Sequence, residues 1–250
     1  MKNLIVITGP TACGKTPVAI ALAKIIGGEI VSADSKQIYR GMDIGTAKPT
    51  LAERDGVPHH LLDIVDPTED FNAAIFGKLA QKAIDNIKNP ILAGGTGFYI
   101  NAAIYENALD RPVGESLKLR YNTTTIILNR DRALLYKAID LRVEEMFVRG
   151  LAKEVEKLLA AGVKEESTAM QALGYKEIVP YLKGQCTLEE AKAAICQKSR
   201  HYAKRQLTWF RHQVQGRWLS MDNITPQEAA AQIAAQLRQE GVLWGKVIRI

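Results

Sequence analysis

A glycine-rich turn between a short apolar strand and a helix constrains this chain more than any other feature. The run from Asn3 to Ile7 is apolar and β-branched, which predicts a buried strand. The next residues are Gly9-Pro10-Thr11-Ala12-Cys13-Gly14-Lys15-Thr16, which fit the pattern G-x-x-x-x-G-K-[ST]. Helical spacing over residues 15–27 then ends at Gly27-Gly28. This order of strand, turn and helix predicts a phosphate-binding loop at the edge of an α/β sheet.

The residue types in this loop explain how it would hold a phosphate. Glycines let backbone N–H groups close around phosphate oxygens, and the start of the helix adds its positive dipole. Lys15 supplies a charge, and the hydroxyl of Thr16 is a ligand for Mg²⁺. The motif does not name the reaction, because the same loop would bind ATP, GTP or a simple pyrophosphate.

The rest of the first half alternates strands with helices. Strands are expected at 29–33, 91–93 and 123–128, and an amphipathic helix at 72–88. Beyond Asp131 the chain is mainly helical, with helices expected at 131–149, 151–161, about 169–183, 187–214 and 226–240 and an edge strand at 218–220. The fold class is therefore α/β: a P-loop NTPase-like parallel sheet flanked by helices, with a helical C-terminal part, as a single core over residues 1–250.

Two further groups of polar residues follow expected strands. Asp34 comes after the second strand, and Gly94-Gly95-Thr96-Gly97 comes after the third. In an open parallel sheet the carboxyl ends of the strands line the ligand crevice, so both groups are expected beside the phosphate loop. Asp34 would accept a proton or hold Mg²⁺ through water, or else cap a turn. The glycine run would allow close approach to a ligand, or would be a plain turn.

The charge of the chain is unevenly distributed. It has 33 Lys+Arg and 27 Asp+Glu, a formal net charge of +6. Residues 1–110 have 10 basic and 12 acidic residues, a net charge of −2, which leaves +8 for residues 111–250. Residues 191–221 contain seven basic residues and no acidic one. Such a block is typical of a solvated helix face, and it also permits a polyanionic partner.

The helix expected at 187–214 carries most of this block. Arg200, Lys204 and Arg211 fall within about 40° of one another around its axis, so they would form a stripe along a phosphate backbone. Aromatic side chains on the same helix complete an apolar face with Leu207, and we expect them in the core rather than as stacking platforms; they are Tyr202, Trp209 and Phe210.

Several other classes of protein are excluded. The three cysteines are too far apart for a disulfide scaffold or a paired metal-ligand motif. No apolar run reaches the roughly 18 residues of a membrane helix, and Leu4 to Ile7 is too short for a signal peptide. No cysteine or carboxylate pattern completes a metal site at His59-His60, so we expect a structural or peripheral role there. We expect a cytoplasmic protein, without a membrane partner, that acts as a monomer.

Several motifs in combination identify a family. Besides the phosphate loop and the glycine run, they are Asp34-Ser35-Lys36-Gln37-Ile38-Tyr39, Gly45-Thr46-Ala47-Lys48-Pro49, Gly174-Tyr175-Lys176-Glu177 and Ala203-Lys204-Arg205-Gln206-Leu207-Thr208-Trp209. With these motifs, the chain resembles the tRNA dimethylallyltransferases, also called tRNA isopentenyltransferases, from Leu4 to about Trp218. The resemblance implies transfer of a five-carbon allyl group from dimethylallyl diphosphate to N6 of the adenosine immediately 3′ of the anticodon, with release of pyrophosphate.

The resemblance also implies roles for individual residues. Asp34 would be the catalytic base, acting with Lys15 and Thr96, and Gly9 to Thr16 would bind the diphosphate with Mg²⁺ on Thr16. Positions that match tRNA contacts of the family are Asp34, Ser35, Lys36, Gln37, Thr96, the segment 167–172 with Met170 and Gln171, and Arg200, Lys204, Arg205 and Gln206.

The chain departs from the family pattern at one place. Family members carry a helical insertion between the helix after the glycine run and the next strand, and it helps to grip the anticodon arm. Here Asp110 continues directly into Arg111-Pro112-Val113-Gly114, so this insertion is expected to be missing. Two single positions also differ from the pattern: Pro17 replaces a small or polar residue, and Ala138 replaces an arginine.

Two other functions stay open at this point. A P-loop small-molecule kinase would use the same motif and fold, although it would not need the basic C-terminal helix. A non-catalytic RNA-binding module would use that helix and would not need Asp34 as a base.

Overall fold

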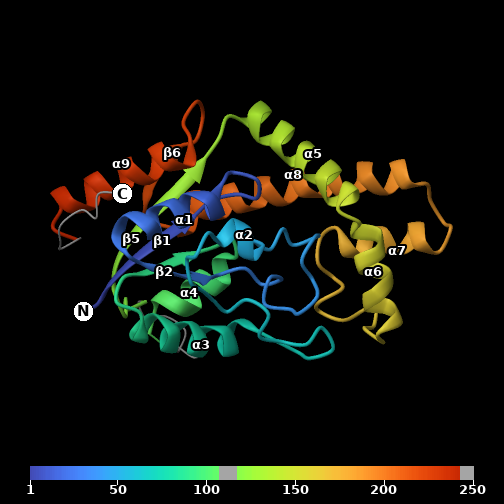
Figure 1. The fold of residues 1–250 in the computed structure, drawn as a ribbon, viewed down its shortest axis with the longest axis horizontal. Helices are drawn as coiled ribbons and strands as arrows, with labels where there is room; N and C mark the ends of the chain where they lie inside the picture. Colours follow the sequence, from blue (N-terminus) through green and yellow to red (C-terminus); the bar gives the residue numbers. More distant parts are fainter. Residues whose placement is uncertain (107–116, 243–250) are drawn as a thin grey trace.

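The apolar run near the N-terminus forms strand β1 (Asn3–Thr8), which pairs with β4 (Pro90–Ala93) on one side and β5 (Asn122–Asn129) on the other. Beyond β4 lie β2 (Glu29–Ser32) and β3 (His59–His60), and beyond β5 lies β6 (Arg217–Ser220). The computed structural model describes residues 1–106 and 117–242, and within them these six strands form one parallel sheet in the order β3-β2-β4-β1-β5-β6 (Figure 1). The predicted α/β class is confirmed.

The helices lie close to where the sequence predicts them. In chain order they are α1 (Lys15–Ile26), α2 (Leu51–Arg54), α3 (Ala73–Asn86), α4 (Gly97–Ile104), α5 (Arg132–Val148), α6 (Leu151–Ala160), α7 (Tyr175–Leu182), α8 (Leu188–Gln213) and α9 (Pro226–Gln239). Side chains of the N-cap residues fix several of their starts: Asn72 accepts hydrogen bonds from the first turn of α3, and Thr187 forms a capping box with Glu190 on α8.

The two faces of the sheet are covered by different helices. Leu4 and Val6 of β1 pack in a buried cluster with α3, α4 and α8, whereas Ile5 and Ile7 pack in a second cluster with α1 and α9. Alternate side chains of a strand point to opposite faces, so a continuous apolar run is what a strand covered on both sides requires. In Figure 1, α3 and α4 lie below the sheet, and α6 and α7 lie at the end of the molecule opposite α9.

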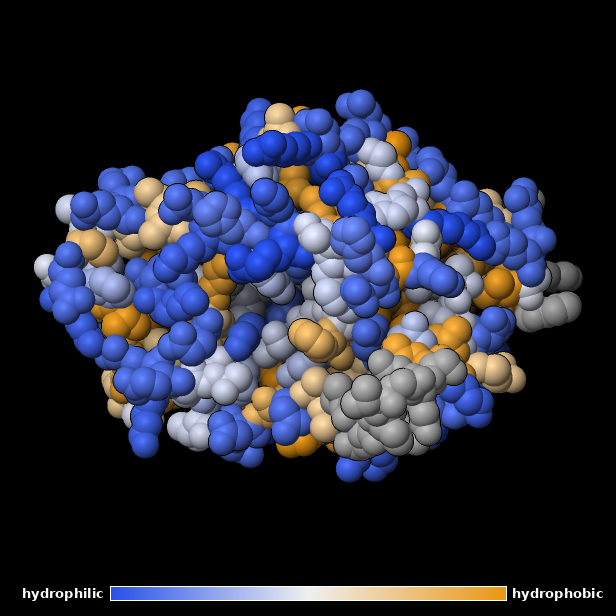
Figure 2. Space-filling view, turned by 180° about the vertical axis from the view of Figure 1, so that it is seen from behind, coloured by the Kyte–Doolittle hydropathy of each residue, from blue (hydrophilic) through white to orange (hydrophobic). Residues whose placement is uncertain are grey.

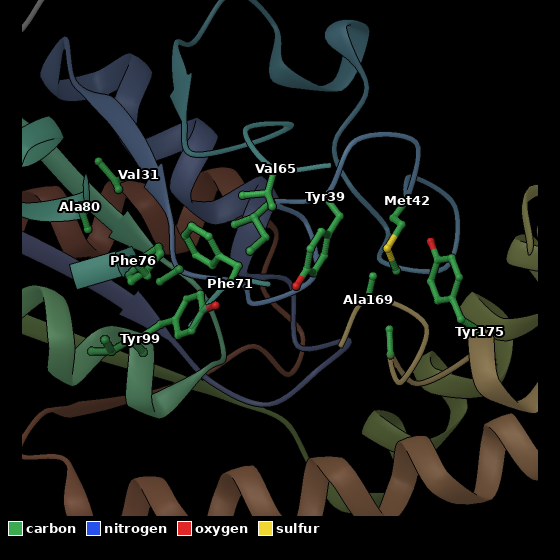
Figure 3. Packing of buried hydrophobic residues seen from close by; sticks show 14 of the residues in the cluster. Val31, Tyr39, Met42, Val65, Phe71, Phe76, Ala80, Tyr99, Ala169 and Tyr175 are labelled. Atoms are coloured by element: carbon green, nitrogen blue, oxygen red, sulfur yellow. The ribbon is translucent and has the colours of Figure 1, made fainter. Parts of the chain in front are cut away.

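The helical C-terminal part shares its core with the sheet. One buried cluster runs from Phe76 and Tyr99, whose rings stack at 4.1 Å, through Tyr39 to Met42 and Tyr175 (Figure 3). Because α6 and α7 pack on the loops that follow β2, they help to shape the edge of the sheet where those loops lie.

Some details differ from the sequence-based expectations. The helix predicted from about residue 169 begins only at Tyr175, because Gly174 has a positive φ of 98° and the Glu177 carboxylate accepts a hydrogen bond from its N–H. The short elements α2 and β3 span four and two residues, too few to give a periodic pattern. The junction after Asp110, where the helical insertion is expected to be missing, lies outside the described residues.

The order of the strands explains why distant motifs meet. β2, β4 and β1 are neighbours and parallel, so the segments that follow them emerge at one edge of the sheet. These segments are the Asp34 loop, the glycine run and the phosphate loop.

In the described part of the chain, no helix is long and apolar enough to cross a membrane.

Candidate active site

The phosphate loop has the backbone that its glycines predict. Gly9 has a φ of +147°, and a Cβ there would lie 2.4 Å from the carbonyl oxygen of Leu128, so a larger residue does not fit. Gly14 has a φ of +93° and caps the N-terminus of α1. The loop therefore points backbone N–H groups and the positive end of α1 toward one side.

Lys15 and Thr16 are placed at the mouth of this loop. The Lys15 Nζ donates hydrogen bonds to the carbonyl oxygens of Gly9 at 3.0 Å and Pro10 at 2.7 Å. Burial lowers the pKa of Lys15, and the nearby charge of Arg142 lowers it further. An anion bound in the loop would compensate both effects, because it favours the charged amine.

Asp34 is fixed by the turn that it starts. Its Oδ1 accepts hydrogen bonds from the N–H groups of Lys36 at 2.9 Å and Gln37 at 3.3 Å. Asp34 thus caps a turn, as one interpretation of the sequence has it, and it also lines the cavities described below. The two interpretations are compatible, because both turn contacts go to Oδ1.

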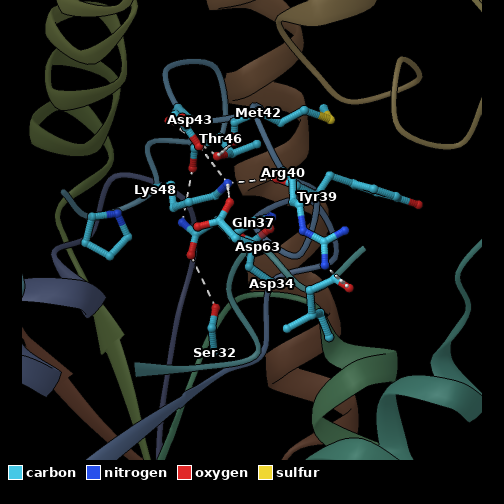
Figure 4. Close-up of polar contacts among 12 residues, drawn as sticks. Ser32, Asp34, Gln37, Tyr39, Arg40, Met42, Asp43, Thr46, Lys48 and Asp63 are labelled. Carbon is cyan, nitrogen blue, oxygen red and sulfur yellow. Dashed lines mark hydrogen bonds and ion pairs between the residues drawn. The ribbon is translucent and has the colours of Figure 1, made fainter. Parts of the chain in front are cut away.

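Thr96 and Gln37 hold the Asp34 loop in place. The Thr96 hydroxyl accepts a hydrogen bond from the Ser35 N–H at 3.2 Å. The Gln37 side chain accepts one from the Ser32 hydroxyl at 3.2 Å and donates to the carbonyl oxygens of Thr46 and Ala47 (Figure 4). Gln37 therefore orders the loop from within.

Gln206 lies behind the phosphate loop. It is buried in α8, its Oε1 accepts a hydrogen bond from the Thr11 N–H at 2.8 Å, and its Nε2 donates to the Gly95 carbonyl oxygen at 2.9 Å. It thereby joins the phosphate loop to the glycine run. The expected contact of Gln206 with tRNA stays a prediction. In this structure both polar atoms of its side chain bond to backbone groups of the phosphate loop and the glycine run.

The basic residues of α8 differ in their surroundings. The Arg200 guanidinium pairs with the Asp140 carboxylate of α5 at 2.6 Å and lies over the ring of Tyr136. Lys204 and Arg205 are exposed. Of the expected stripe, Lys204 and Arg211 are therefore exposed, and Arg205 is an exposed charge beside it.

The segment 167–172 approaches the Asp34 loop. The Lys36 Nζ donates a hydrogen bond to the Thr168 carbonyl oxygen at 2.6 Å, and burial lowers the pKa of Lys36. Gln171 is exposed, whereas Met170 is fully buried, so the Met170 side chain does not reach the surface.

Two residues of the site were missed in the sequence. Arg142 donates hydrogen bonds from Nη1 to the Thr11 hydroxyl at 3.1 Å and from Nη2 to the Thr46 carbonyl oxygen at 3.3 Å. Its sequence signal is a charge on the helix face that also carries the buried Leu135 and Ile139. Tyr202, expected in the core, lines the site instead. Burial raises its pKa to about 12 and the charge of Asp34 acts in the same direction, so its hydroxyl remains a donor.

Two cavities meet at this edge of the sheet. The larger, of about 900 Å³, lies against the phosphate loop and α1, and the smaller, of about 310 Å³, lies against the segment 171–173 and α8. Five residues line both: Thr11, Asp34, Thr46, Arg142 and Tyr202. The surface in Figure 2 is mainly hydrophilic and is hollowed near its centre. A phosphate-bearing ligand and a second ligand would therefore meet beside Asp34.

The chain matches a known family in sequence. The family model described as IPP transferase matches residues 37–117 and 107–213. The tRNA dimethylallyltransferase of Pelotomaculum thermopropionicum is 38% identical, covering 97% of this chain and 98% of the relative. That alignment spans 308 positions and this chain has 250 residues, so at least 58 positions have no residue here. The two matched segments meet at 107–117, beside Asp110.

Solved structures agree with this match. The tRNA delta(2)-isopentenylpyrophosphate transferase of Staphylococcus epidermidis has a TM-score of 0.87 and 36% identity, covering 96% of this chain and 100% of that chain. The full-length tRNA isopentenylpyrophosphate transferase of Bacillus halodurans has a TM-score of 0.86 and 36% identity, covering 97% and 99% of the two chains. The chain therefore belongs to the IPP transferase family, to which the tRNA dimethylallyltransferases belong.

Proposed function

We propose that this protein is a transferase that moves the dimethylallyl group of dimethylallyl diphosphate to N6 of the adenosine 3′-adjacent to the anticodon of a tRNA and releases pyrophosphate. The observation that carries this proposal is the meeting of two cavities at Asp34, one of them lined by a phosphate loop. A transfer between two substrates needs such a junction, whereas a phosphate-binding module alone does not.

The larger cavity suits the donor. The loop Gly9 to Thr16 would hold the diphosphate through its backbone N–H groups, with Lys15 and Arg142 supplying positive charge. Apolar side chains also line this cavity, among them Ile20, Ile25 and Ile30. Charge that develops on the leaving pyrophosphate is then stabilised by groups already in place.

The smaller cavity suits the adenine. It opens beside basic side chains, the half-buried Lys36 and the exposed Lys176 and Arg205, which would contact RNA phosphates. Tyr202 borders it with a protonated hydroxyl. An adenosine inside an RNA stem or loop must leave its stack to enter such a cavity, as bases modified by enzymes do.

The residues at the junction perform a simple substitution. As the bond between N6 and the first allyl carbon forms, the bond from that carbon to the diphosphate oxygen breaks, and its electron pair leaves with pyrophosphate. The N6 proton passes to the Asp34 carboxylate, which acts as general base. Thr96 acts indirectly: its hydroxyl accepts the hydrogen bond from the Ser35 N–H and so holds the Asp34 loop.

The donor set of the site suits a magnesium ion. Thr16 offers a hydroxyl and Asp34 a carboxylate, and among the described residues no group of three His, Cys, Asp or Glu side chains is placed to hold a metal ion. Mg²⁺ commonly uses few protein ligands and completes its shell with phosphate oxygens and water. When bound, the ion would neutralise charge on the diphosphate.

Release of pyrophosphate tests this function against the kinase alternative. With dimethylallyl diphosphate and an anticodon stem-loop that has adenosine at the target position, pyrophosphate release should depend on the RNA. A stem-loop with guanosine at that position is the control and should leave the donor intact. ATP consumption on a small metabolite, with no RNA-dependent release of pyrophosphate, would refute the proposal.

A further inference from the structure

A carboxylate that lines neither cavity holds the loop between them. The Glu154 side chain on α6 accepts hydrogen bonds from three successive backbone N–H groups, those of Asp43 at 3.0 Å, Ile44 at 2.8 Å and Gly45 at 3.2 Å. Each is a charge-assisted bond, which is stronger than a bond between neutral groups. Glu154 is therefore the group that fixes the turn 43–45 from outside.

Tyr175 completes this grip. Its hydroxyl donates a hydrogen bond to Glu154 Oε1 at 2.5 Å. Burial raises the pKa of Tyr175, and the charge of Glu154 raises it further, so the hydroxyl stays protonated. The ring lies directly against Gly45, where a Cβ would be 2.4 Å from it. The carboxylate, the phenol and the glycine thus form one close-packed unit.

The residue after this turn holds an arginine of the site. The Thr46 carbonyl oxygen accepts hydrogen bonds from Arg142 Nη2 at 3.3 Å and from Gln37 Nε2 at 3.2 Å. Arg142 Nη1 reaches the Thr11 hydroxyl of the phosphate loop. The guanidinium is therefore held between the turn and the phosphate loop.

Lys48 holds the other side of the same loop and also reaches the turn 43–45 through the Asp43 carboxylate. Lys48 has only 3% of its side chain exposed, and its Nζ donates hydrogen bonds to the carboxylates of Asp43 and Asp63 and to the Tyr39 carbonyl oxygen (Figure 4). With one end fixed by Lys48, the position of the Thr46 carbonyl depends on how the turn 43–45 is held. Glu154 provides that hold from a helix more than a hundred residues away in the chain.

We propose that Glu154 is a positioning residue for Arg142. Its carboxylate sets the turn 43–45, the turn sets the Thr46 carbonyl, and that carbonyl aims the guanidinium at the diphosphate. Glu154 lines neither of the two cavities described above, so it acts through Arg142 and does not contact substrate. The effect of Glu154 on dimethylallyl diphosphate rests on the proposed function, whereas its effect on the binding of a pyrophosphate anion does not.

Kinetics of Glu154→Gln test this role. The amide keeps the size of the side chain but presents a donor to at least one of the three N–H groups. We expect the KM for dimethylallyl diphosphate to rise about tenfold, the effect of losing a charge-assisted bond, with the KM for RNA unchanged. Glu156→Gln, on the exposed side of α6, should leave both values at the wild-type level. An unchanged donor KM in Glu154→Gln would overturn the proposal.

A double-mutant cycle separates positioning from general stability. Arg142→Lys alone should raise the donor KM, and adding Glu154→Gln should raise it little further, because both changes remove one interaction. Fully additive effects, or equal losses for donor and RNA, would contradict the proposal. Tyr175→Phe removes one hydrogen bond to Glu154 and should raise the donor KM less than Glu154→Gln does. An unchanged donor KM in Tyr175→Phe would count against the proposal.

Binding of inorganic pyrophosphate keeps this inference distinct from the proposed function. Calorimetry should give a Kd about tenfold weaker for Glu154→Gln than for the wild type. If the wild type binds pyrophosphate with this dependence but transfers no allyl group, the proposed function fails and the role of Glu154 stands. Equal Kd values for the two proteins would overturn the role of Glu154.

Discussion

The buried side chain of Gln206 joins α8 to the phosphate loop through the N–H of Thr11, at 2.8 Å. The same helix exposes Lys204 and Arg205 on its outer surface. One helix therefore carries the basic surface expected to face RNA and also braces the loop expected to hold the diphosphate. The two expected binding sites, for RNA and for the diphosphate, therefore both depend on α8.

Gln206→Glu tests this brace. A carboxylate still accepts from the Thr11 N–H, but it cannot donate to the Gly95 carbonyl oxygen, and it places a negative charge behind the diphosphate. We expect the donor KM to rise by about tenfold or more, as for the loss of one buried hydrogen bond. Gln213→Glu, at the exposed end of α8, adds the same charge and should leave the donor KM unchanged. Equal donor KM values for the two variants would contradict the brace.

The lowered pKa of Lys15 predicts a pH dependence. Its amine loses charge at a lower pH than a free lysine, so kcat/KM for the donor should fall as the pH rises through that pKa. Lys15→Arg keeps its charge and should lose this alkaline fall, even if its activity is lower. Lys36→Arg should retain the fall. A pH profile that is the same in wild type and Lys15→Arg would show that Lys15 does not titrate in the donor step.

The exposed basic residues of α8 predict the salt dependence of RNA binding. Removing Lys204 and Arg205 together should weaken binding of an anticodon stem-loop and lower the slope of log K against log salt by about one to two. The double variant Lys78→Ala and Lys82→Ala removes the same charge from exposed positions of α3. If that control lowers the slope as much, the RNA does not lie along α8.

Gly94 predicts a large effect on stability. A Cβ at this position would lie 2.2 Å from the Ala33 carbonyl oxygen, so Gly94→Ala must displace the strand ends that carry the site. We expect the free energy of unfolding to fall by about 2–3 kcal/mol, as for overpacking of a core. Gly162→Ala, where a Cβ meets nothing within 4 Å, should cost about 1 kcal/mol from its left-handed backbone alone. Urea unfolding of both variants measures the difference.

The fold followed from the sequence where local pattern decides structure. The apolar run at β1 and the glycine pattern of the phosphate loop can each be recognised from the local sequence alone. The helix expected from about residue 169 was wrong at its start, because Gly174 and the buried Glu177 carboxylate impose a turn that periodicity does not reveal.

The site was predictable only in part. Parallel strands bring the segments after β1, β2 and β4 together, so the meeting of Lys15, Asp34 and Thr96 followed from general rules of sheet topology. Arg142 and Gln206 come from helices whose packing depends on the whole fold, and their sequence signal is only a polar residue on a buried helix face. Tyr202 looked like a core residue for the same reason.

The nucleoside product tests the central claim most directly. After incubation with dimethylallyl diphosphate, Mg²⁺ and an anticodon stem-loop, the RNA is digested and its nucleosides are analysed by mass spectrometry. The account predicts an adenosine that has gained one C5H8 unit on N6 at the position 3′ of the anticodon. It also predicts that Asp34→Asn binds the RNA normally but forms about a hundredfold less product or lower still, the scale of general base catalysis. An RNA left without the added unit by the wild-type protein, or an Asp34→Asn variant that modifies it at the wild-type rate, would contradict the account.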